Sequence, residues 1–128
     1  TSQIRYIIRS SYSNPPIYGA EIIRTILSNN LLKRKWTKEL GLMREFILSK
    51  RQQLCQKLRD KGHVQLSNKI YAQEGMFAYF DLAPLVVDYL RETHAIYMTG
   101  GGRMNLCGLN DDDIDDFLNA ICGRLKHA

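Results

Sequence analysis

Apolar residues recur at helical spacing through the middle of the chain. Between residues 31 and 61 they fall three, four or seven positions apart and form one stripe, which predicts a single long helix. The stripe consists of Leu32, Trp36, Leu40, Met43, Ile47, Leu54 and Leu58. Gly62 marks the expected end of this helix, because glycine adopts the left-handed conformation that often ends helices. A shorter helix is predicted over 20–28, and Asn29 and Asn30 separate the two.

Strand-like and helical stretches alternate in the second half of the chain. Aromatic and β-branched residues predict strands there, and Pro84 suits the first turn of a helix. The predicted elements are, in chain order, a strand within 69–80, a helix at 83–93, strands at 95–99 and 104–107, and a helix that Asn110 or Asp111 caps and that runs to about Arg124. This order predicts an α+β fold with a small, mainly antiparallel sheet.

Acidic residues crowd the first half of the final helix, at Asp112, Asp113, Asp115 and Asp116. Lys126 and His127 follow the end of this helix, so the charges are ordered as the helix dipole favours. A cation site is the alternative for such a cluster. The cluster lacks the glycine and the terminal glutamate of a calcium-binding loop, so we favour capping and expect no metal site.

The net charge of +5 comes mainly from residues 33–61, where ten of the basic residues lie. A basic nucleic-acid-binding domain is one alternative for this segment. Base-stacking aromatic residues are not interleaved with the charges, so we favour a solvated helix face and expect no nucleic acid partner. No apolar run is long enough to span a bilayer, so we expect no membrane partner.

The length of 128 residues fits one compact domain with its own core. Cys55, Cys107 and Cys122 have no metal-ligand spacing, which predicts reduced thiols in an intracellular compartment. The sequence starts at Thr1 and enters an apolar run at Ile4. From this start we expect a chain cut from a longer one.

Arg103 follows three glycines in the string Thr99-Gly100-Gly101-Gly102-Arg103-Met104-Asn105. Glycine lets the backbone turn sharply and lets another group approach closely. A planar guanidinium suits bidentate binding of a carboxylate, so this pattern indicates an anion-binding arginine at the mouth of a strand. The alternative is a surface arginine in an ordinary glycine-rich turn.

A second arginine precedes a stiff loop in the string Arg9-Ser10-Ser11-Tyr12-Ser13-Asn14-Pro15-Pro16. Two consecutive prolines fix the backbone and remove two hydrogen-bond donors, so this loop cannot lie inside a helix. The alternative is an ordinary loop, in which Pro16 and Gly19 come just before the next helix.

Together with Gly75-Met76-Phe77 and Gly108, these two strings resemble the C-terminal portion of the aspartate aminotransferases, which are pyridoxal-phosphate enzymes of fold type I. The resemblance covers essentially the whole chain. It implies that residues 1–28 are the tail of the large cofactor-binding domain. Residues 29–128 are then the small domain with its long interdomain helix. It also implies a homodimer that transfers amino groups between aspartate or glutamate and 2-oxo acids, in the cytoplasm or alternatively in mitochondria.

The resemblance implies a role for each matching residue. Arg103 binds the substrate's α-carboxylate, and Arg9 binds the distal carboxylate in the partner subunit's site. Ser13 and Asn14 line that neighbouring site. Phe77 lies near the substrate, with a core aromatic on a strand as the alternative. For Asn105 we favour a structural role, supporting the turn at Arg103.

The family's cofactor lysine has no match among these residues. The resemblance implies that the parent chain is an enzyme that uses pyridoxal phosphate. The 128 residues alone should contain no catalytic residue and should not catalyse. Two alternatives remain, a non-catalytic binding or regulatory module with the same fold and the basic nucleic-acid-binding domain.

Overall fold

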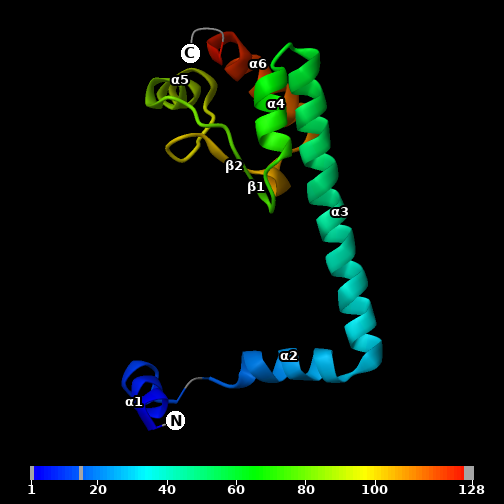
Figure 1. The fold of residues 1–128 in the computed structure, drawn as a ribbon, viewed down its shortest axis with the longest axis vertical. Helices are drawn as coiled ribbons and strands as arrows, with labels where there is room; N and C mark the ends of the chain where they lie inside the picture. The colour runs from blue at the N-terminus through cyan, green and yellow to red at the C-terminus, as the bar shows by residue number, and fades with distance from the viewer. Residues whose placement is uncertain (1, 15, 126–128) are drawn as a thin grey trace. The chain divides into compact units, whose positions relative to one another are not determined.

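The computed structural model describes residues 2–14 and 16–125, so the predictions on Pro15, Lys126 and His127 lie outside the described residues. In chain order the elements are α1 (Ser2–Ser11), α2 (Tyr18–Ser28), α3 (Asn30–Asp60), α4 (Val64–Tyr71), β1 (Phe77–Tyr79), α5 (Pro84–His94), β2 (Arg103–Asn105), a short 3₁₀ helix η1 (Leu106–Gly108) and α6 (Asp111–Leu125) (Figure 1). The chain divides into two compact units, Thr1–Gly41 and Leu42–Ala128. The predicted α+β fold with a small antiparallel sheet is confirmed.

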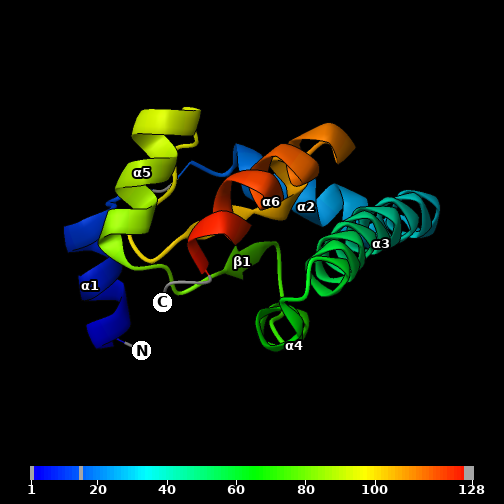
Figure 2. The ribbon, with the colours of Figure 1, turned by 90° about the horizontal axis from the view of Figure 1, so that it is seen from above.

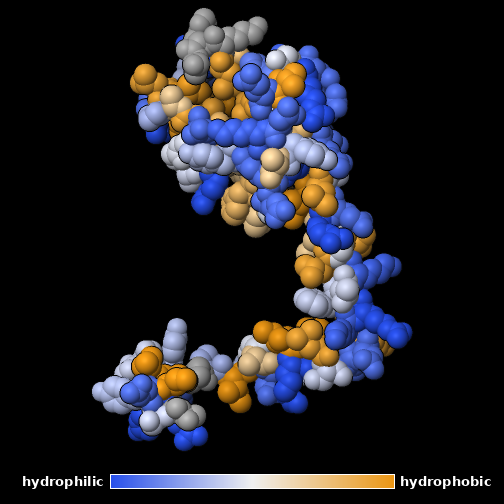
Figure 3. Space-filling model, in the orientation of Figure 1, coloured by the Kyte–Doolittle hydropathy of each residue, from blue (hydrophilic) through white to orange (hydrophobic). Residues whose placement is uncertain are grey.

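The first unit contains α1, α2 and the start of α3. Helix α1, which the sequence analysis did not predict, ends where Ser13 adopts φ +58 and its N–H donates to the Ile8 carbonyl. Helix α2 begins at Tyr18, two residues before its predicted start. Asn29 caps α3, because its Oδ1 accepts from the backbone N–H groups of Leu31 and Leu32. Apolar side chains of α2 lie on the surface (Figure 3).

The second unit has a closed core. The second half of α3 contributes Leu54 and Leu58, which belong to the predicted stripe, and α6 contributes a helical stripe that the sequence analysis did not describe. The α6 stripe is Ile114, Phe117, Leu118 and Ile121. Seen from above, α6 lies between α5 and the second half of α3 (Figure 2). No helix of the described residues is sufficiently long and apolar to span a membrane.

The strand predicted within 69–80 is found only at its end, as β1 (Phe77–Tyr79). Its first residues belong to α4, which lies alongside the second half of α3 in Figures 1 and 2. Gly62, at φ +85, ends α3 as predicted and lets the chain reverse into α4. Ser67 Oγ then donates to the Cys55 carbonyl at 2.8 Å, and Ile70 enters the core. Tertiary packing of one helical face therefore overrides the strand propensity of these residues.

The sheet consists of β1 and β2, paired antiparallel with Phe77 opposite Asn105 and Tyr79 opposite Arg103. The strand predicted at 95–99 is wrong. Ala95 adopts φ +53 as the C-cap of α5, and that segment contributes only the Thr99–Arg103 bridge. The strand predicted at 104–107 stops at residue 105, because the chain enters η1.

Glycines form the turn before β2. The Gly102 N–H donates to the Thr99 carbonyl, and Gly101 and Gly102 have φ +76 and +75. A Cβ on Gly101 would collide with the Tyr79 ring, and a Cβ on Gly102 would lie 2.7 Å from the Leu82 side chain. The turn therefore requires glycine for its backbone conformation and for its close packing.

Ion pairs connect α3 and α4 to later segments. Lys50 donates to Asp111 at 2.7 Å, and its hydrogen bond and charge hold the pKa of Asp111 below its usual value. The contact of Lys69 with Asp81 likewise lowers the pKa of Asp81, whereas burial raises the pKa of the Cys55 thiol. Asp113 accepts from the Asn110 N–H at 3.0 Å, which confirms the capping role for this part of the acidic cluster.

Replacing Asp111 by asparagine tests the ion pair between α3 and α6. Because the folded-state pKa is lowered, the stabilisation is present above the unfolded-state pKa of about 3.9 and is lost as the pH falls through the folded-state pKa. We expect Asp111→Asn to lower the Tm at neutral pH, with the difference vanishing in strong acid. Circular dichroism during heating measures the Tm difference at neutral pH and in strong acid.

Asp112→Asn is the matched control. It also removes an acidic charge from the first turn of α6, but among the described residues no ion pair connects Asp112 to α3. An equal loss of Tm in the two variants would mean that the helix dipole, rather than Lys50, accounts for the effect.

Gly102→Ala tests the turn before β2. The substitution places a side chain at φ +75 and against Leu82, so we expect it to lower the free energy of unfolding by about 1–3 kcal/mol. Gly108→Ala is the control, because a Cβ there meets nothing within 4 Å. Urea unfolding measures both, and equal losses would contradict a special requirement at Gly102.

Candidate functional site

The exposed face of the β-hairpin gathers the predicted site residues of the second unit. Side chains two apart on a strand share a face, and directly paired residues of neighbouring strands do too. One face therefore carries Phe77, Tyr79, Arg103 and Asn105, and we call it the hairpin face. These residues are exposed, whereas Ala78 on the opposite face is fully buried in the core. The hairpin therefore packs on the core through the face opposite to the hairpin face.

Arg103 stacks on Phe77 within the hairpin face. The guanidinium carbon lies 4.8 Å from the centroid of the Phe77 ring, which is a cation–π contact. Among the described residues, no carboxylate forms an ion pair with Arg103. The ring contacts the guanidinium, whose N–H groups can donate to an external carboxylate.

Asn105 supports the chain next to Arg103. Its Oδ1 accepts from the Cys107 N–H at 3.0 Å and so caps η1. This contact is structural, but it supports η1 after β2, whereas the sequence analysis predicted support of the turn at Arg103.

The other predicted site residues belong to the first unit. Arg9 is exposed in the last turn of α1, and Ser13 and Asn14 follow in the loop after that helix. The structure brings Phe77 and Arg103 together, but it describes the first unit by itself. A shared site that includes Arg9, Ser13 and Asn14 stays a prediction.

Two polar residues that the sequence analysis missed fasten β1. Arg51 is 3% exposed, and its guanidinium donates to the carbonyls of Ile70, Gly75 and Phe77 at 2.7–3.0 Å. The Gln73 amide accepts from the Tyr79 N–H at 2.7 Å and donates to the Tyr79 carbonyl at 2.8 Å. Both side chains therefore act on the backbone of the strand that carries Phe77.

The sequence holds one signal for Arg51. The predicted apolar stripe skips from Ile47 to Leu54, and Arg51 occupies the helical position between them, four residues after one and three before the other. A charged residue at a core position indicates a buried guanidinium with hydrogen-bond partners. Gln73 lies outside any periodic pattern and gives no such signal.

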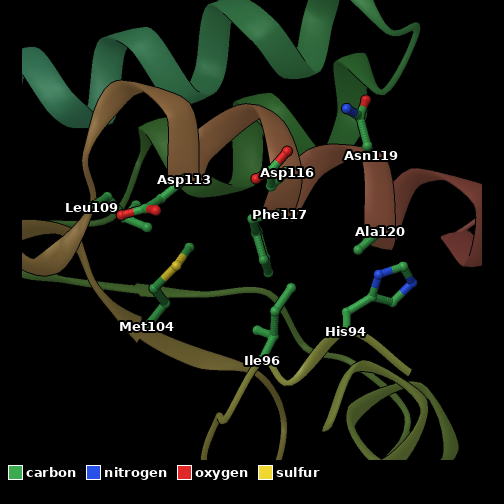
Figure 4. A pocket seen from close by; sticks show the side chains of 9 residues that line it. All are labelled: His94, Ile96, Met104, Leu109, Asp113, Asp116, Phe117, Asn119 and Ala120. Atoms are coloured by element: carbon green, nitrogen blue, oxygen red, sulfur yellow. The ribbon is translucent and has the colours of Figure 1, made fainter. Parts of the chain in front are cut away.

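A cavity of about 580 Å³ is lined in part by Met104, which lies on the face of β2 opposite to Arg103 because side chains alternate along a strand. Figure 4 shows the residues that line it. Its lining consists of His94, Ile96, Met104, Leu109, Asp113, Asp116, Phe117, Asn119 and Ala120. In Figure 4 the Phe117 ring extends from α6 toward Ile96. Two carboxylates at its wall make the cavity unsuitable for a carboxylate substrate, so the hairpin face is the better candidate site.

Several basic residues of α3 form contacts within the second unit. Lys50 and Lys57 pair with aspartates of α6, and Arg51 donates to backbone carbonyls. These contacts favour a structural role over a nucleic-acid interface for the second half of this helix. Among the described residues no group of three His, Cys, Asp or Glu side chains could hold a metal ion.

The lysines of the described residues do not fit pyridoxal phosphate, which needs a lysine beside a phosphate-binding cradle. Those of the second unit have other partners: Lys50, Lys57 and Lys69 donate to aspartates and Lys61 donates to Asn119. Those of the first unit, Lys33, Lys35 and Lys38, are exposed on α3. Lys126 lies outside the described residues.

Known proteins resemble this chain along most of its length. Mitochondrial aspartate aminotransferase of Dictyostelium discoideum is 34% identical over 98% of the chain. The structure of cytoplasmic aspartate aminotransferase from Saccharomyces cerevisiae is 36% identical and superimposes on all of the chain with a TM-score of 0.87. An aromatic-amino-acid aminotransferase from Burkholderia pseudomallei, covalently bound to pyridoxal phosphate, is 38% identical over 95% of the chain with a TM-score of 0.86.

These proteins are much longer than the chain. It spans 29% of the Dictyostelium relative and 31% of each of the two structures. The sequence pattern of the family described as aminotransferase class I and II matches residues 1–121. The structures confirm the predicted fold type I aminotransferase architecture. On this match, which covers nearly every residue, the chain belongs to the class I and II aminotransferases.

Proposed function

We propose that the chain is the C-terminal portion of an aspartate aminotransferase and that it supplies the arginines that bind the substrate's carboxylates. The hairpin face carries this proposal. Arg103 follows a glycine turn, stacks on Phe77, and forms no ion pair with a described carboxylate. A bidentate guanidinium in this setting suits the α-carboxylate, which every amino-acid substrate has.

The preference for aspartate and glutamate rests on Arg9. The proteins that resemble the chain include both aspartate and aromatic-amino-acid aminotransferases, so membership of the family does not choose between these substrates. A second cation facing the substrate's side chain selects dicarboxylates, because only they present a second carboxylate to it. Arg9, exposed at the end of α1, is proposed for this contact in the partner subunit's site of a homodimer, with Ser13 and Asn14 beside it.

The cofactor belongs to the parent enzyme in this proposal. Pyridoxal phosphate is bound covalently in the Burkholderia pseudomallei structure, and it would be held in the parent by residues outside these 128. The chain alone is then inactive. Residues 1–28 would complete the large domain and 29–128 the small one, and the boundary of the compact units within α3 supports an interdomain helix. We place the parent in the cytoplasm, with mitochondria as the alternative.

Arg103→Ala in the full-length parent tests the α-carboxylate contact. Loss of a charged bidentate contact should lower kcat/KM for all amino-acid substrates by on the order of 10²-fold or more. Arg124→Ala is the control, because Arg124 also stacks on an aromatic ring, that of Tyr89 at 4.0 Å, but lies on α6. Near-normal efficiency of Arg103→Ala in steady-state assays would refute the assignment.

Arg9→Ala tests the dicarboxylate contact. We expect a loss of kcat/KM for aspartate and glutamate on the order of 10²-fold, and a much smaller loss for alanine, which has no second carboxylate. Arg5→Ala removes a similar exposed charge one turn earlier in α1 and serves as the control. Equal losses on aspartate and alanine would make Arg9 a structural residue.

A further inference from the structure

The outer edge of β1 has no neighbouring strand among the described residues. In an antiparallel pair, hydrogen-bonded and non-hydrogen-bonded residue pairs alternate. The Leu106 N–H donates to the Met76 carbonyl and the Phe80 N–H donates to the Gly102 carbonyl. Phe77 and Tyr79 therefore belong to non-hydrogen-bonded pairs, and their peptide groups point away from β2.

Side chains take the place of a third strand at this edge. Arg51 binds the Phe77 carbonyl at 2.9 Å, and Gln73 binds both the N–H and the carbonyl of Tyr79. Three of the outward peptide groups of β1 are thus satisfied by two side chains. An exposed strand edge presents unpaired N–H and C=O groups, and here the hydrogen bonds of Arg51 and Gln73 satisfy them and hold the strand in place.

The same strand orients Arg103. The guanidinium of Arg103 lies over the Phe77 ring, and Tyr79 stands directly opposite Arg103 in the register. Tyr79 also packs on Gly101 in the turn that leads into β2. A shift of β1 along or away from β2 would therefore move the ring that supports the guanidinium and the side chain that packs on its turn.

We propose that Arg51 and Gln73 are positioning residues for substrate recognition, which act through the backbone of β1 on the Phe77–Arg103 stack. This rests on the proposed function of Arg103. Arg51 suits the task because its rigid fork reaches three carbonyls at once, from the end of α4, the loop after it and β1. A lysine ammonium carries its three donors on one nitrogen and cannot reproduce the planar fork.

The test uses the full-length parent enzyme with Arg51→Lys and Gln73→Leu. We expect each to raise KM for aspartate by on the order of tenfold with a smaller change in kcat, because a displaced guanidinium binds the carboxylate less well. Gln73 is only half-buried, so its variant keeps the test valid even if Arg51→Lys folds poorly.

Lys50→Met is the matched control. Lys50 is the neighbouring buried cation on α3, but its ammonium donates to Asp111 of α6, and among the described residues no hydrogen bond connects it to β1. It should lower the Tm without raising KM. If Lys50→Met raises KM as much as Arg51→Lys, or if Arg51→Lys and Gln73→Leu lower the Tm and leave KM unchanged, the positioning role is wrong.

A double-mutant cycle separates this inference from the proposed function. If Arg51 acts through Arg103, the effect of Arg51→Lys on kcat/KM should shrink to within about twofold in an Arg103→Lys background. If the losses in kcat/KM of the two single variants instead multiply in the double variant, the positioning role is overturned, while Arg103 stays the proposed carboxylate ligand. Normal efficiency of Arg103→Lys and Arg103→Ala would instead overturn the proposed function, and the positioning role with it.

Discussion

The buried guanidinium of Arg51 is the interaction on which the second unit depends. It comes from the middle of α3 and binds carbonyls of three segments that follow. A buried charge is costly unless hydrogen bonds replace its hydration, and here backbone carbonyls do so without a carboxylate among the described residues. The same bonds satisfy carbonyls that would otherwise be buried without a hydrogen-bond partner or left unpaired at a strand edge. One side chain therefore connects the long helix, α4 and the hairpin.

The hairpin needs this support because it is very short. Each strand has three residues, and an isolated two-stranded hairpin is marginal in water. Ala78 anchors it to the core from below, the glycine turn closes it against Tyr79 and Leu82, and Gln73 satisfies its outer edge. The exposed hairpin face can then carry Arg103 and Phe77 with their geometry fixed by contacts on every other side. Preorganisation of this kind lowers the cost of ordering a binding site.

The final helix was predicted from its cap and its charge order. Periodicity predicted the long helix, and its stripe marks a core face at Leu54 and Leu58, whereas the earlier stripe residues Leu32, Trp36, Leu40 and Met43 are exposed. It failed at α4, where a few strand-forming residues face the core on a short helix, and at 95–99, where Ala95 ends α5 in a left-handed conformation. The family resemblance assigned Phe77 and Arg103 to one substrate site although they lie 26 positions apart in the sequence, but it did not predict the cation–π contact between them. The role of Gln73 could not be predicted, because its partner is a backbone that folds beside it only in the finished structure. The substrate contacts of Arg9, Ser13 and Asn14 stay predictions.

The two proposed carboxylate ligands, Arg103 and Arg9, differ in the contacts that hold their segments in place. Arg103 stands on a hairpin that a closed core, an α3 guanidinium and a glycine turn hold from within the same unit. Arg9 stands at the end of a helix none of whose residues is buried, and the apolar side of that helix, with Ile4 and Ile7, is exposed. Exposed apolar surface of this extent is typical of faces that pack against another partner. The proposed α-carboxylate contact, common to all amino acids, would thus rest on local structure, whereas the proposed contact that would select dicarboxylates would depend on packing outside the first unit.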